Sequence, residues 1–173
     1  HELSSIGLRA DQGKVEAIKR MPTPTDKQSL QRLLGLATFL ARYCSNFSEI
    51  TAPLRELIKT GNEFAWDFRH TEALDRLRTL LSTSPVLQYF AHDKHVTVQS
   101  DASQSGLGAV LLQDNKVVEY ASRAMTSSET RYSQIERELL AIVFAMERFD
   151  TYVYGRRITV ETDHKPLLAI HKK

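Results

Sequence analysis

The sequence predicts a mixed α/β protein in which a helical first part is followed by a sheet with one packed helix. Between about residues 11 and 85, apolar residues recur every three or four positions, as on the buried face of amphipathic helices. Beyond about residue 93, apolar and polar residues alternate in several short segments, which is the period of half-buried strands. We therefore expect two domains, 1–90 and 91–173, with the boundary near residues 86–93.

Composition restricts the class of protein. The chain has 173 residues, of which 42% are hydrophobic, and this suits one domain of average size or two small ones. Its net charge of +2 lacks the strong basic excess of a stand-alone nucleic-acid-binding domain, although local basic patches remain compatible with it. A single cysteine, Cys44, excludes a disulfide scaffold and a cysteine-rich zinc site. No apolar run has the length of a membrane span, no signal peptide is visible, and the start without Met indicates a piece of a longer protein.

The first two helices are predicted from their capping residues. Residues 1–9 fit the end of a hairpin, and Asp11 can cap a helix that runs to about Met21. After a proline-rich break, Thr25-Asp26-Lys27-Gln28 fits a capping box, with Thr25 as the cap, that opens a strong helix ending near Asn46.

Two further helices complete the first part. One starts at Phe47, with Pro53 in its first turn and Gly61 as its end. The other covers residues 70–82 and ends at Ser84-Pro85. Its apolar side is expected to consist of Leu74, Leu77, Leu80 and Leu81.

The second part is predicted as a three-stranded meander, a long helix, a strand and the start of another helix. These elements are expected at 95–101, 107–113, 116–123, about 128–149, 157–163 and 165–171. On a helical wheel of the long helix, the buried stripe is formed by Ile135, Leu139, Ile142, Met146 and Phe149.

Carboxylates follow two of these strands. Asp101 ends the first strand on its polar face, and Asp163 ends the strand at 157–163 in the same way, so the two side chains can meet. The helix between them offers Glu136 at one edge of its buried stripe and Glu138 at the other. The edge of the helix that carries Glu138 also carries small residues, which permit a close approach to the sheet. Periodicity therefore favours Glu138, but only mildly.

Three crowded carboxylates point to a divalent cation, although the pattern leaves another interpretation open. Crowded acids repel and raise one another's pKa, and a hard cation such as Mg²⁺ or Mn²⁺ removes that cost. Two such ions, roughly 4 Å apart, activate water and stabilise the leaving oxygen of a phosphodiester. Alternatively, the aspartates are turn formers and the glutamates are solvated, which is the commoner situation for such residues.

Several linked motifs resemble the ribonuclease H domain of gypsy-class LTR retrotransposon reverse transcriptases. They are Gln99–Ser103, Gly106–Leu111, Glu136–Val143, Tyr154–Arg157 and Thr162–Leu167. The helical part is similar to the thumb and connection of the same polyprotein at Gly7-Leu8, Asp11, Lys14–Ile18, Leu33–Leu36, Tyr43, Phe47 and Ala52–Leu54. The resemblance extends over essentially the whole chain.

The resemblance implies a small helical thumb/connection followed by a C-terminally truncated ribonuclease H-like mixed sheet with a packed helix. It implies Mg²⁺- or Mn²⁺-dependent cleavage of the RNA strand of RNA–DNA hybrids, with Asp101, Glu138 and Asp163 as catalytic metal ligands. The family's fourth acidic residue would lie beyond Lys173, so this chain is expected to need its continuation for full activity. The polymerase's paired aspartates are missing from the sequence.

The resemblance also implies partners: an RNA–DNA hybrid or primer–template, the fingers and palm of the reverse transcriptase, and a second subunit as a further candidate. It implies an intracellular location, in the cytoplasm, a virus-like particle or the nucleus, without a membrane. The alternative is a non-catalytic nucleic-acid-binding or assembly module derived from a retrotransposon. Candidate nucleic-acid contacts, each also compatible with an ordinary surface or turn residue, are Lys27, Gln31, Arg32, Arg156, Arg157 and His164.

Overall fold

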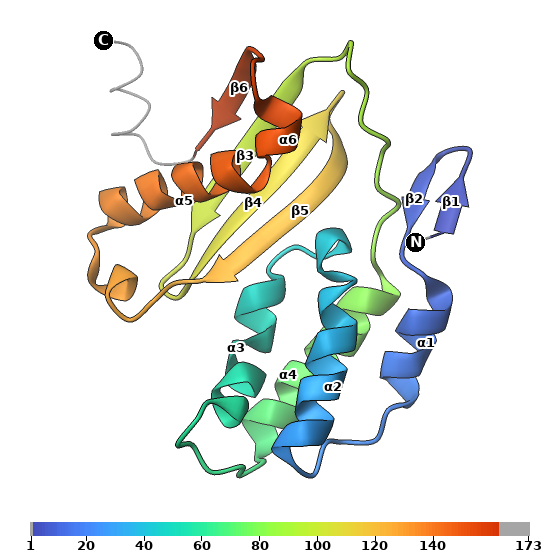
Figure 1. Cartoon of the computed structure of the whole chain (residues 1–173), viewed down its shortest axis with the longest axis vertical. Coiled ribbons are helices and arrows are strands. Elements are labelled where there is room, and N and C mark those ends of the chain that lie inside the picture. Colours follow the sequence, from blue (N-terminus) through green and yellow to red (C-terminus); the bar gives the residue numbers. More distant parts are fainter. Residues whose placement is uncertain (1, 163–173) are drawn as a thin grey trace. The chain divides into compact units, whose positions relative to one another are not determined.

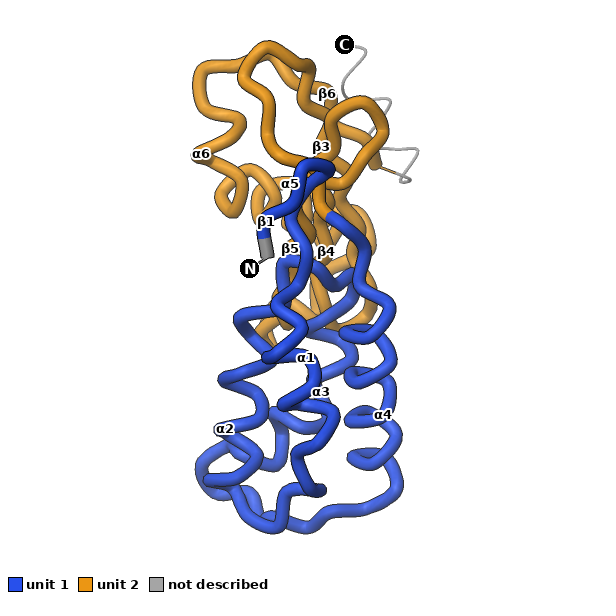
Figure 2. Tube along the Cα trace, turned by 90° about the vertical axis from the view of Figure 1, so that its right-hand side faces the viewer, with its two compact units in different colours: residues 1–86 blue, residues 87–173 orange. Residues whose placement is uncertain are grey.

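The computed structural model describes residues 2–162. The chain divides between Val86 and Leu87 into two compact units, which Figure 2 shows in different colours. The first unit is helical apart from one hairpin, and the second contains a mixed four-stranded sheet with packed helices, so the mixed α/β class predicted from the sequence is confirmed. None of the helices between residues 2 and 162 is both long and apolar enough to cross a membrane.

The first unit begins with an antiparallel hairpin of β1 (Glu2–Ser4) and β2 (Gly7–Arg9). The helices that follow are α1 (Gln12–Arg20), α2 (Lys27–Thr38), the 3₁₀ helix η1 (Ala41–Tyr43), α3 (Phe47–Ile58) and α4 (Phe68–Ser82). The apolar faces of α2, α3 and α4 meet in a core of Leu30, Leu34, Leu54, Leu57 and Ala73, against which Phe64 and Trp66 pack. The helical periodicity of the sequence therefore identified these helices. On the apolar side predicted for α4, Leu74, Leu77 and Leu81 are buried, whereas Leu80 is only half-buried.

Three helix details differ from the prediction. The cap of α2 is Asp26, one residue later than predicted, because its carboxylate accepts a hydrogen bond from the Ser29 backbone N at 2.7 Å. This helix ends at Thr38 rather than near Asn46, since Leu40 N bonds back to the carbonyl of Ala37 and closes a tighter turn. Pro53 lies in the second turn of α3 rather than the first, where its ring removes one backbone donor from the helix.

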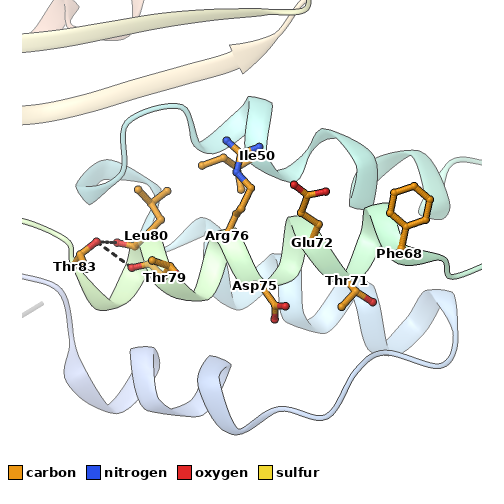
Figure 3. Close-up of a pocket in the computed structure, with 9 residues that line it drawn as sticks. All are labelled: Ile50, Phe68, Thr71, Glu72, Asp75, Arg76, Thr79, Leu80 and Thr83. Carbon is orange, nitrogen blue, oxygen red and sulfur yellow. Dashed lines mark hydrogen bonds between the residues drawn. The ribbon is translucent and has the colours of Figure 1, made fainter.

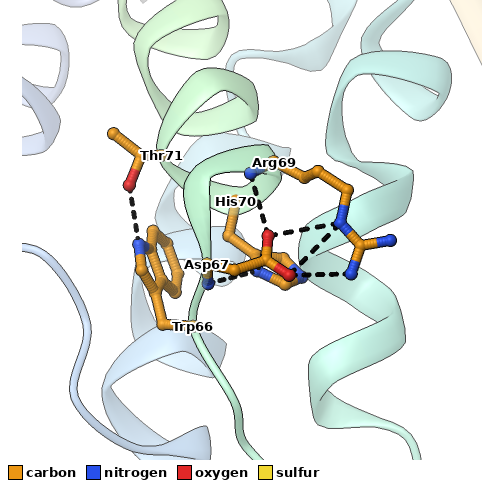
Figure 4. A network of polar contacts seen from close by, with 5 residues as sticks. All are labelled: Trp66, Asp67, Arg69, His70 and Thr71. Atoms are coloured by element: carbon orange, nitrogen blue, oxygen red, sulfur yellow. Dashed lines mark hydrogen bonds and ion pairs between the residues drawn. The ribbon is translucent and has the colours of Figure 1, made fainter.

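The start of α4 is fixed by a compact polar network (Figure 4). Asp67 caps the helix by accepting a 2.9 Å hydrogen bond from Arg69 N, and its own N donates to Nδ1 of the buried His70 at 2.9 Å. Nε1 of Trp66 donates to Oγ1 of Thr71 at 2.9 Å. The Arg69 guanidinium hydrogen-bonded to Asp67 lowers the pKa of that carboxyl to about 2. The helix consequently begins at Phe68, two residues before the predicted start.

The sheet of the second unit has the order β5-β4-β3-β6 (Figure 1). Its strands are β3 (Val96–Ala102), β4 (Gly106–Gln113), β5 (Lys116–Ala124) and β6 (Ile158–Glu161). The first three pair antiparallel, whereas β6 pairs parallel with β3, opposite Val96 to Gln99. The predicted strands of the meander are confirmed to within one residue at each end, and the predicted helix at 165–171 lies outside the described residues.

The long helix of this unit, α5 (Gln134–Arg148), starts later than predicted, and the short helix α6 (Asp150–Val153) follows it. The predicted start near residue 128 is wrong because the 3₁₀ helix η2 (Glu129–Arg131) intervenes and Ser133 caps α5. The Ser133 Oγ accepts from Glu136 N, while Glu136 accepts from Ser133 N at 2.7 Å. Glu136 is thus a capping residue, with its pKa lowered by these hydrogen bonds.

The face that α5 turns toward the sheet also differs from the predicted stripe. Ala141 and Ala145 are fully buried against β3 and β4, whereas Leu139 of the predicted stripe is 44% exposed, and Phe149 of that stripe is buried as predicted. Alanines let the helix axis approach the sheet closely, and Phe144 shares this buried face with them. As a result, Glu138, predicted at the edge of the stripe, lies on the buried face.

Candidate active site

Asp101 stands near the C-terminal end of β3, opposite Gly108 of β4. The buried residues of β3 alternate with exposed ones, and Asp101 is on the exposed face, opposite to the face that carries Val96 and Val98. Its Oδ1 accepts a 2.8 Å hydrogen bond from Ala102 N. The Asp101 carboxylate is therefore solvent-accessible and lies immediately before the turn that leads into β4.

That turn, residues 103–106, is held by the Ser103 side chain. Ser103 Oγ accepts hydrogen bonds from Gly106 N at 2.9 Å and from Ser105 N at 3.3 Å, and Ser103 N donates to Gly106 O at 2.9 Å. The connection between the first two strands of the predicted meander is therefore a tight hairpin. The backbone beside the aspartate is well ordered by these bonds, which restricts where the carboxylate can lie.

Glu138 is only 6% exposed, although it is an ionisable residue. It lies on the face of α5 that packs against β3 and β4, one helical turn before Ala141. Burial of a carboxylate is unfavourable unless hydrogen-bond donors or a cation replace the lost water. One such donor is Gln134, whose Nε2 lies 2.7 Å from Glu138 Oε1. Glu136, by contrast, is exposed, and its carboxylate accepts the hydrogen bond from Ser133 N that caps α5. Glu138 is therefore the candidate site residue of this helix.

The start of α5 and the end of β3 are neighbours. Arg137 Nη1 lies 3.4 Å from the carbonyl oxygen of Ser103, two residues after Asp101. Asp101 and Glu138 thus come from opposite faces of the sheet but from elements that meet at the C-terminal end of β3. Among residues 2–162, no three His, Cys, Asp or Glu side chains gather closely enough to hold a metal ion. Asp163, the third predicted ligand, lies outside the described residues.

The predicted nucleic-acid contacts have different surroundings. Lys27 Nζ donates to the carbonyl of Lys59 at 3.0 Å and so joins α2 to the end of α3. Gln31, Arg32 and Arg157 are exposed, while His164 lies outside the described residues.

Arg156 takes part in holding the loop before β3. Its Nη2 donates to the carbonyl of His92 at 2.6 Å, and its guanidinium lies 5.0 Å from the centre of the Phe90 ring. These two contacts attach the segment between α6 and β6 to the loop. Arg156 therefore has a structural role in the fold, whatever else it contacts.

A separate hollow of about 720 Å³ lies on the first unit, along α4 (Figure 3). Phe68, Glu72 and Arg76 follow one another along its helix, and Ile50 of α3 contributes from the neighbouring helix. The described lining residues include none of the predicted catalytic or nucleic-acid-binding residues. The hollow is therefore not part of the candidate active site.

Sequence reasoning missed two residues that contact this site, Gln134 and Arg137. Gln134 precedes Glu138 by four positions and Arg137 follows Gln134 by three, which are the spacings at which helical side chains meet. That spacing was the available signal in the sequence.

Comparison with known proteins identifies the family. Residues 66–160, more than half of the chain, match the family described as the RNase H-like domain found in reverse transcriptase. The chain belongs to this family. The matched region begins at Trp66, just before the cap of α4 in the first unit, and extends through most of β6, so it includes residues of both units.

The relatives are retrotransposon polyproteins. The chain is 33% identical over 172 residues to the retrovirus-related Pol polyprotein from transposon 297 of Drosophila melanogaster, and 34% identical over 178 residues to that from transposon gypsy of the same organism. These alignments cover 99% and 95% of this chain but only 16% and 17% of the polyproteins. The resemblance to gypsy-class reverse transcriptases predicted from the motifs is confirmed.

Solved structures show the same fold. The foamy viral protease-reverse transcriptase in complex with an RNA/DNA hybrid has a TM-score of 0.85 and 24% identity, covering 98% of this chain and 24% of that protein. The dRH form in complex with double-stranded DNA has a TM-score of 0.84 and 24% identity, covering 96% of this chain and 30% of that protein. The ribonuclease H-like fold class predicted from the sequence is confirmed by these neighbours.

Proposed function

We propose that this chain is part of a retrotransposon reverse transcriptase and that it contributes to hydrolysis of the RNA strand of RNA–DNA hybrids with Mg²⁺ or Mn²⁺. The observation that supports this most is the burial of Glu138 on α5, the helix whose Arg137 reaches the turn that follows Asp101. A carboxylate on the packed face of a helix reduces stability, and a metal-dependent reaction explains its presence there. Membership of the RNase H-like family supports the same reaction.

Asp101, Glu138 and Asp163 would hold the metal ions. The two described carboxylates provide hard oxygen donors, which suit Mg²⁺ and Mn²⁺. Asp163 is proposed as the third ligand because the segment Thr162–Leu167 resembles the family motif that carries this aspartate.

Each carboxylate has a distinct task in this proposal. Divalent ions bound there would supply an activated water and stabilise the leaving oxygen of the cleaved phosphodiester. Asp101, exposed at the strand end, is the ligand that the substrate side can reach. Glu138, approaching from the core face, holds the opposite side of the site in a fixed position because α5 is packed on the sheet.

For nucleic-acid binding, we propose contacts from the exposed Gln31, Arg32 and Arg157 to the sugar-phosphate backbone, since such contacts carry most of the affinity for nucleic acids. Lys27 and Arg156 are also candidates, although each already donates a hydrogen bond to a backbone carbonyl of its own unit. His164 is a further candidate. The structural neighbours were solved with DNA and with an RNA/DNA hybrid, which supports a hybrid or primer–template as the partner. The fingers and palm and a second subunit are the proposed protein partners.

The decisive experiment measures cleavage of a labelled RNA–DNA hybrid with Mg²⁺ and then Mn²⁺. It compares this chain with a longer form that continues past Lys173. We expect Asp101→Asn to abolish cleavage while hybrid affinity is retained, because a neutral amide is a poor ligand for a hard cation. Asp93→Asn, at an exposed aspartate outside the site, is the matched control.

Unchanged cleavage by Asp101→Asn would contradict the assignment of the site. If neither form of the chain cleaves and both bind the hybrid, the chain is a non-catalytic nucleic-acid-binding module instead. Cleavage by the longer form alone would mean that a residue beyond Lys173 completes the site. Cleavage by both would mean that the carboxylates of this chain suffice.

A further inference from the structure

The hydrogen bonds around Glu138 form a chain that leads from the buried carboxylate to the turn after Asp101. Gln134 Nε2 donates to Glu138 Oε1 at 2.7 Å, and Arg137 Nη2 donates to Gln134 Oε1 at 2.8 Å. Arg137 Nη1 then reaches the carbonyl of Ser103 at 3.4 Å. Two side chains of the first turn of α5 thereby connect the helix carboxylate to the hairpin that carries Asp101.

The partners determine the orientation of the Gln134 amide. An amide oxygen and nitrogen are hard to distinguish by shape, and their assignment depends on the surrounding hydrogen bonds. Here the nitrogen faces the Glu138 carboxylate and the oxygen faces the Arg137 guanidinium. The reversed amide would place oxygen against a carboxylate and nitrogen against a cation, so only one orientation is stable. Gln134 is itself exposed, and the chain of contacts therefore runs from the surface to the buried Glu138.

Arg137 supplies the rigid part of this arrangement. Its planar guanidinium contacts Gln134 and Ser103 through two different nitrogens, which a lysine ammonium cannot reproduce with the same geometry. Ser103 is in turn held by its hydrogen bonds within the turn to Gly106. Movement of α5 relative to the end of β3 would break the contact between Arg137 and Ser103.

We propose that Gln134 and Arg137 are positioning residues of the metal site. Gln134 orients the Glu138 carboxylate, and Arg137 sets the distance between that carboxylate and the turn after Asp101. This inference rests on the proposed function, since it assumes that Glu138 and Asp101 bind the ion. Residues that orient metal ligands in this way typically change metal affinity by about 10- to 100-fold when they are removed.

The test is Mn²⁺ binding by this chain, measured by isothermal titration calorimetry. Gln134→Met keeps the length of the side chain but removes both hydrogen bonds, and we expect the Kd for Mn²⁺ to rise about tenfold. Arg137→Met is more informative, because the two possible effects of removing Arg137 change the Kd for Mn²⁺ in opposite directions. A cation near the site repels Mn²⁺, so its removal alone would tighten binding, whereas loss of positioning weakens it. We expect weaker binding, and Arg137→Lys should not restore it.

Matched controls are Gln28→Met on α2 and Arg148→Met at the far end of α5, both exposed and outside the site. They should leave the Kd unchanged. Unchanged affinity in Gln134→Met, together with lost binding in Glu138→Gln, would overturn the positioning role and leave the proposed function standing. Tighter binding in Arg137→Met would overturn the role of Arg137.

Failure of both this chain and the form that continues past Lys173 to bind Mn²⁺ and to cleave the hybrid would contradict the proposed function itself. In that case, the contact chain is tested without metal by nuclear magnetic resonance. The side-chain amide signals of Gln134 should shift in Arg137→Met and in Glu138→Gln. Signals that stay in place would show that the contacts are not formed and would overturn the inference independently.

Discussion

The replacement Ala141→Leu tests how closely α5 must approach the sheet. Ala141 is fully buried, one turn after Glu138, and belongs to the core that includes Val96 and Val98 of β3. Leucine adds three carbons to the side chain on the face that touches the strands. The helix must then either move away from the sheet or accommodate the side chain in a strained rotamer.

The expected magnitude follows from two opposing effects. If an empty space lay beside Ala141, burying three carbons at about 0.8 kcal/mol each would stabilise the unit by about 2 kcal/mol. Because Ala141 is 0% exposed and surrounded by strand residues, overpacking is expected instead, at a cost of about 1–3 kcal/mol. For a unit of this size, each kcal/mol lowers Tm by roughly 4–8 °C. The sign of the change in Tm therefore distinguishes a close-packed contact from a loose one.

Differential scanning calorimetry of the wild type and Ala141→Leu measures this change. Ala17→Leu makes the same substitution on an exposed part of α1 and is the control, which should leave Tm nearly unchanged. Displacement of α5 should also weaken Mn²⁺ binding, because Glu138 moves with the helix. A Tm equal to or above that of the wild type would refute the argument that buried alanines hold α5 close to the sheet.

Two further predictions concern the first unit. The pKa of Asp67 is lowered to about 2, chiefly by its hydrogen bond from Arg69, so its contribution to stability is present above its ordinary pKa of 3.8 and is lost as pH falls toward 2. The Tm difference between wild type and Asp67→Asn should therefore be largest above about pH 4 and should shrink as pH falls toward 2. A Tm difference that is constant with pH would contradict this. Burial raises the pKa of Cys44 to about 12, so a thiol reagent at pH 8 should label it only when the chain unfolds. Rapid labelling of the native chain, at the rate of the denatured one, would contradict its burial.

The strands were predictable because their signal is local. Along β3, apolar residues alternate with polar ones, and any sheet that buries Val96 and Val98 leaves Asp101 on the other face. The turn after Asp101 was equally visible, since Ser103 and the glycines are turn formers. Family motifs added Glu138 to this site, which periodicity alone favoured only mildly over Glu136.

The helix faces were harder to predict, because apolar size and burial are different quantities. The helical wheel of α5 ranked Leu139 as buried, whereas the structure leaves it 44% exposed and buries Ala141 completely. A helix that lies flat on a sheet selects small residues for the closest contact, and this selection depends on the partner surface. The Gln134 and Arg137 contacts were missed for a related reason, since spacing permits such hydrogen bonds but rotamers and neighbours decide whether they form.

The sequence by itself determined the alternation that exposes Asp101, the tight turn after it, and the order of helices and strands, because each depends on residues close together in the chain. Only the tertiary structure decided that β6 pairs parallel with β3 and that α5 turns Glu138 toward the sheet. Both depend on contacts between residues far apart in the sequence, where packing and hydrogen bonding of whole elements outweigh local preference.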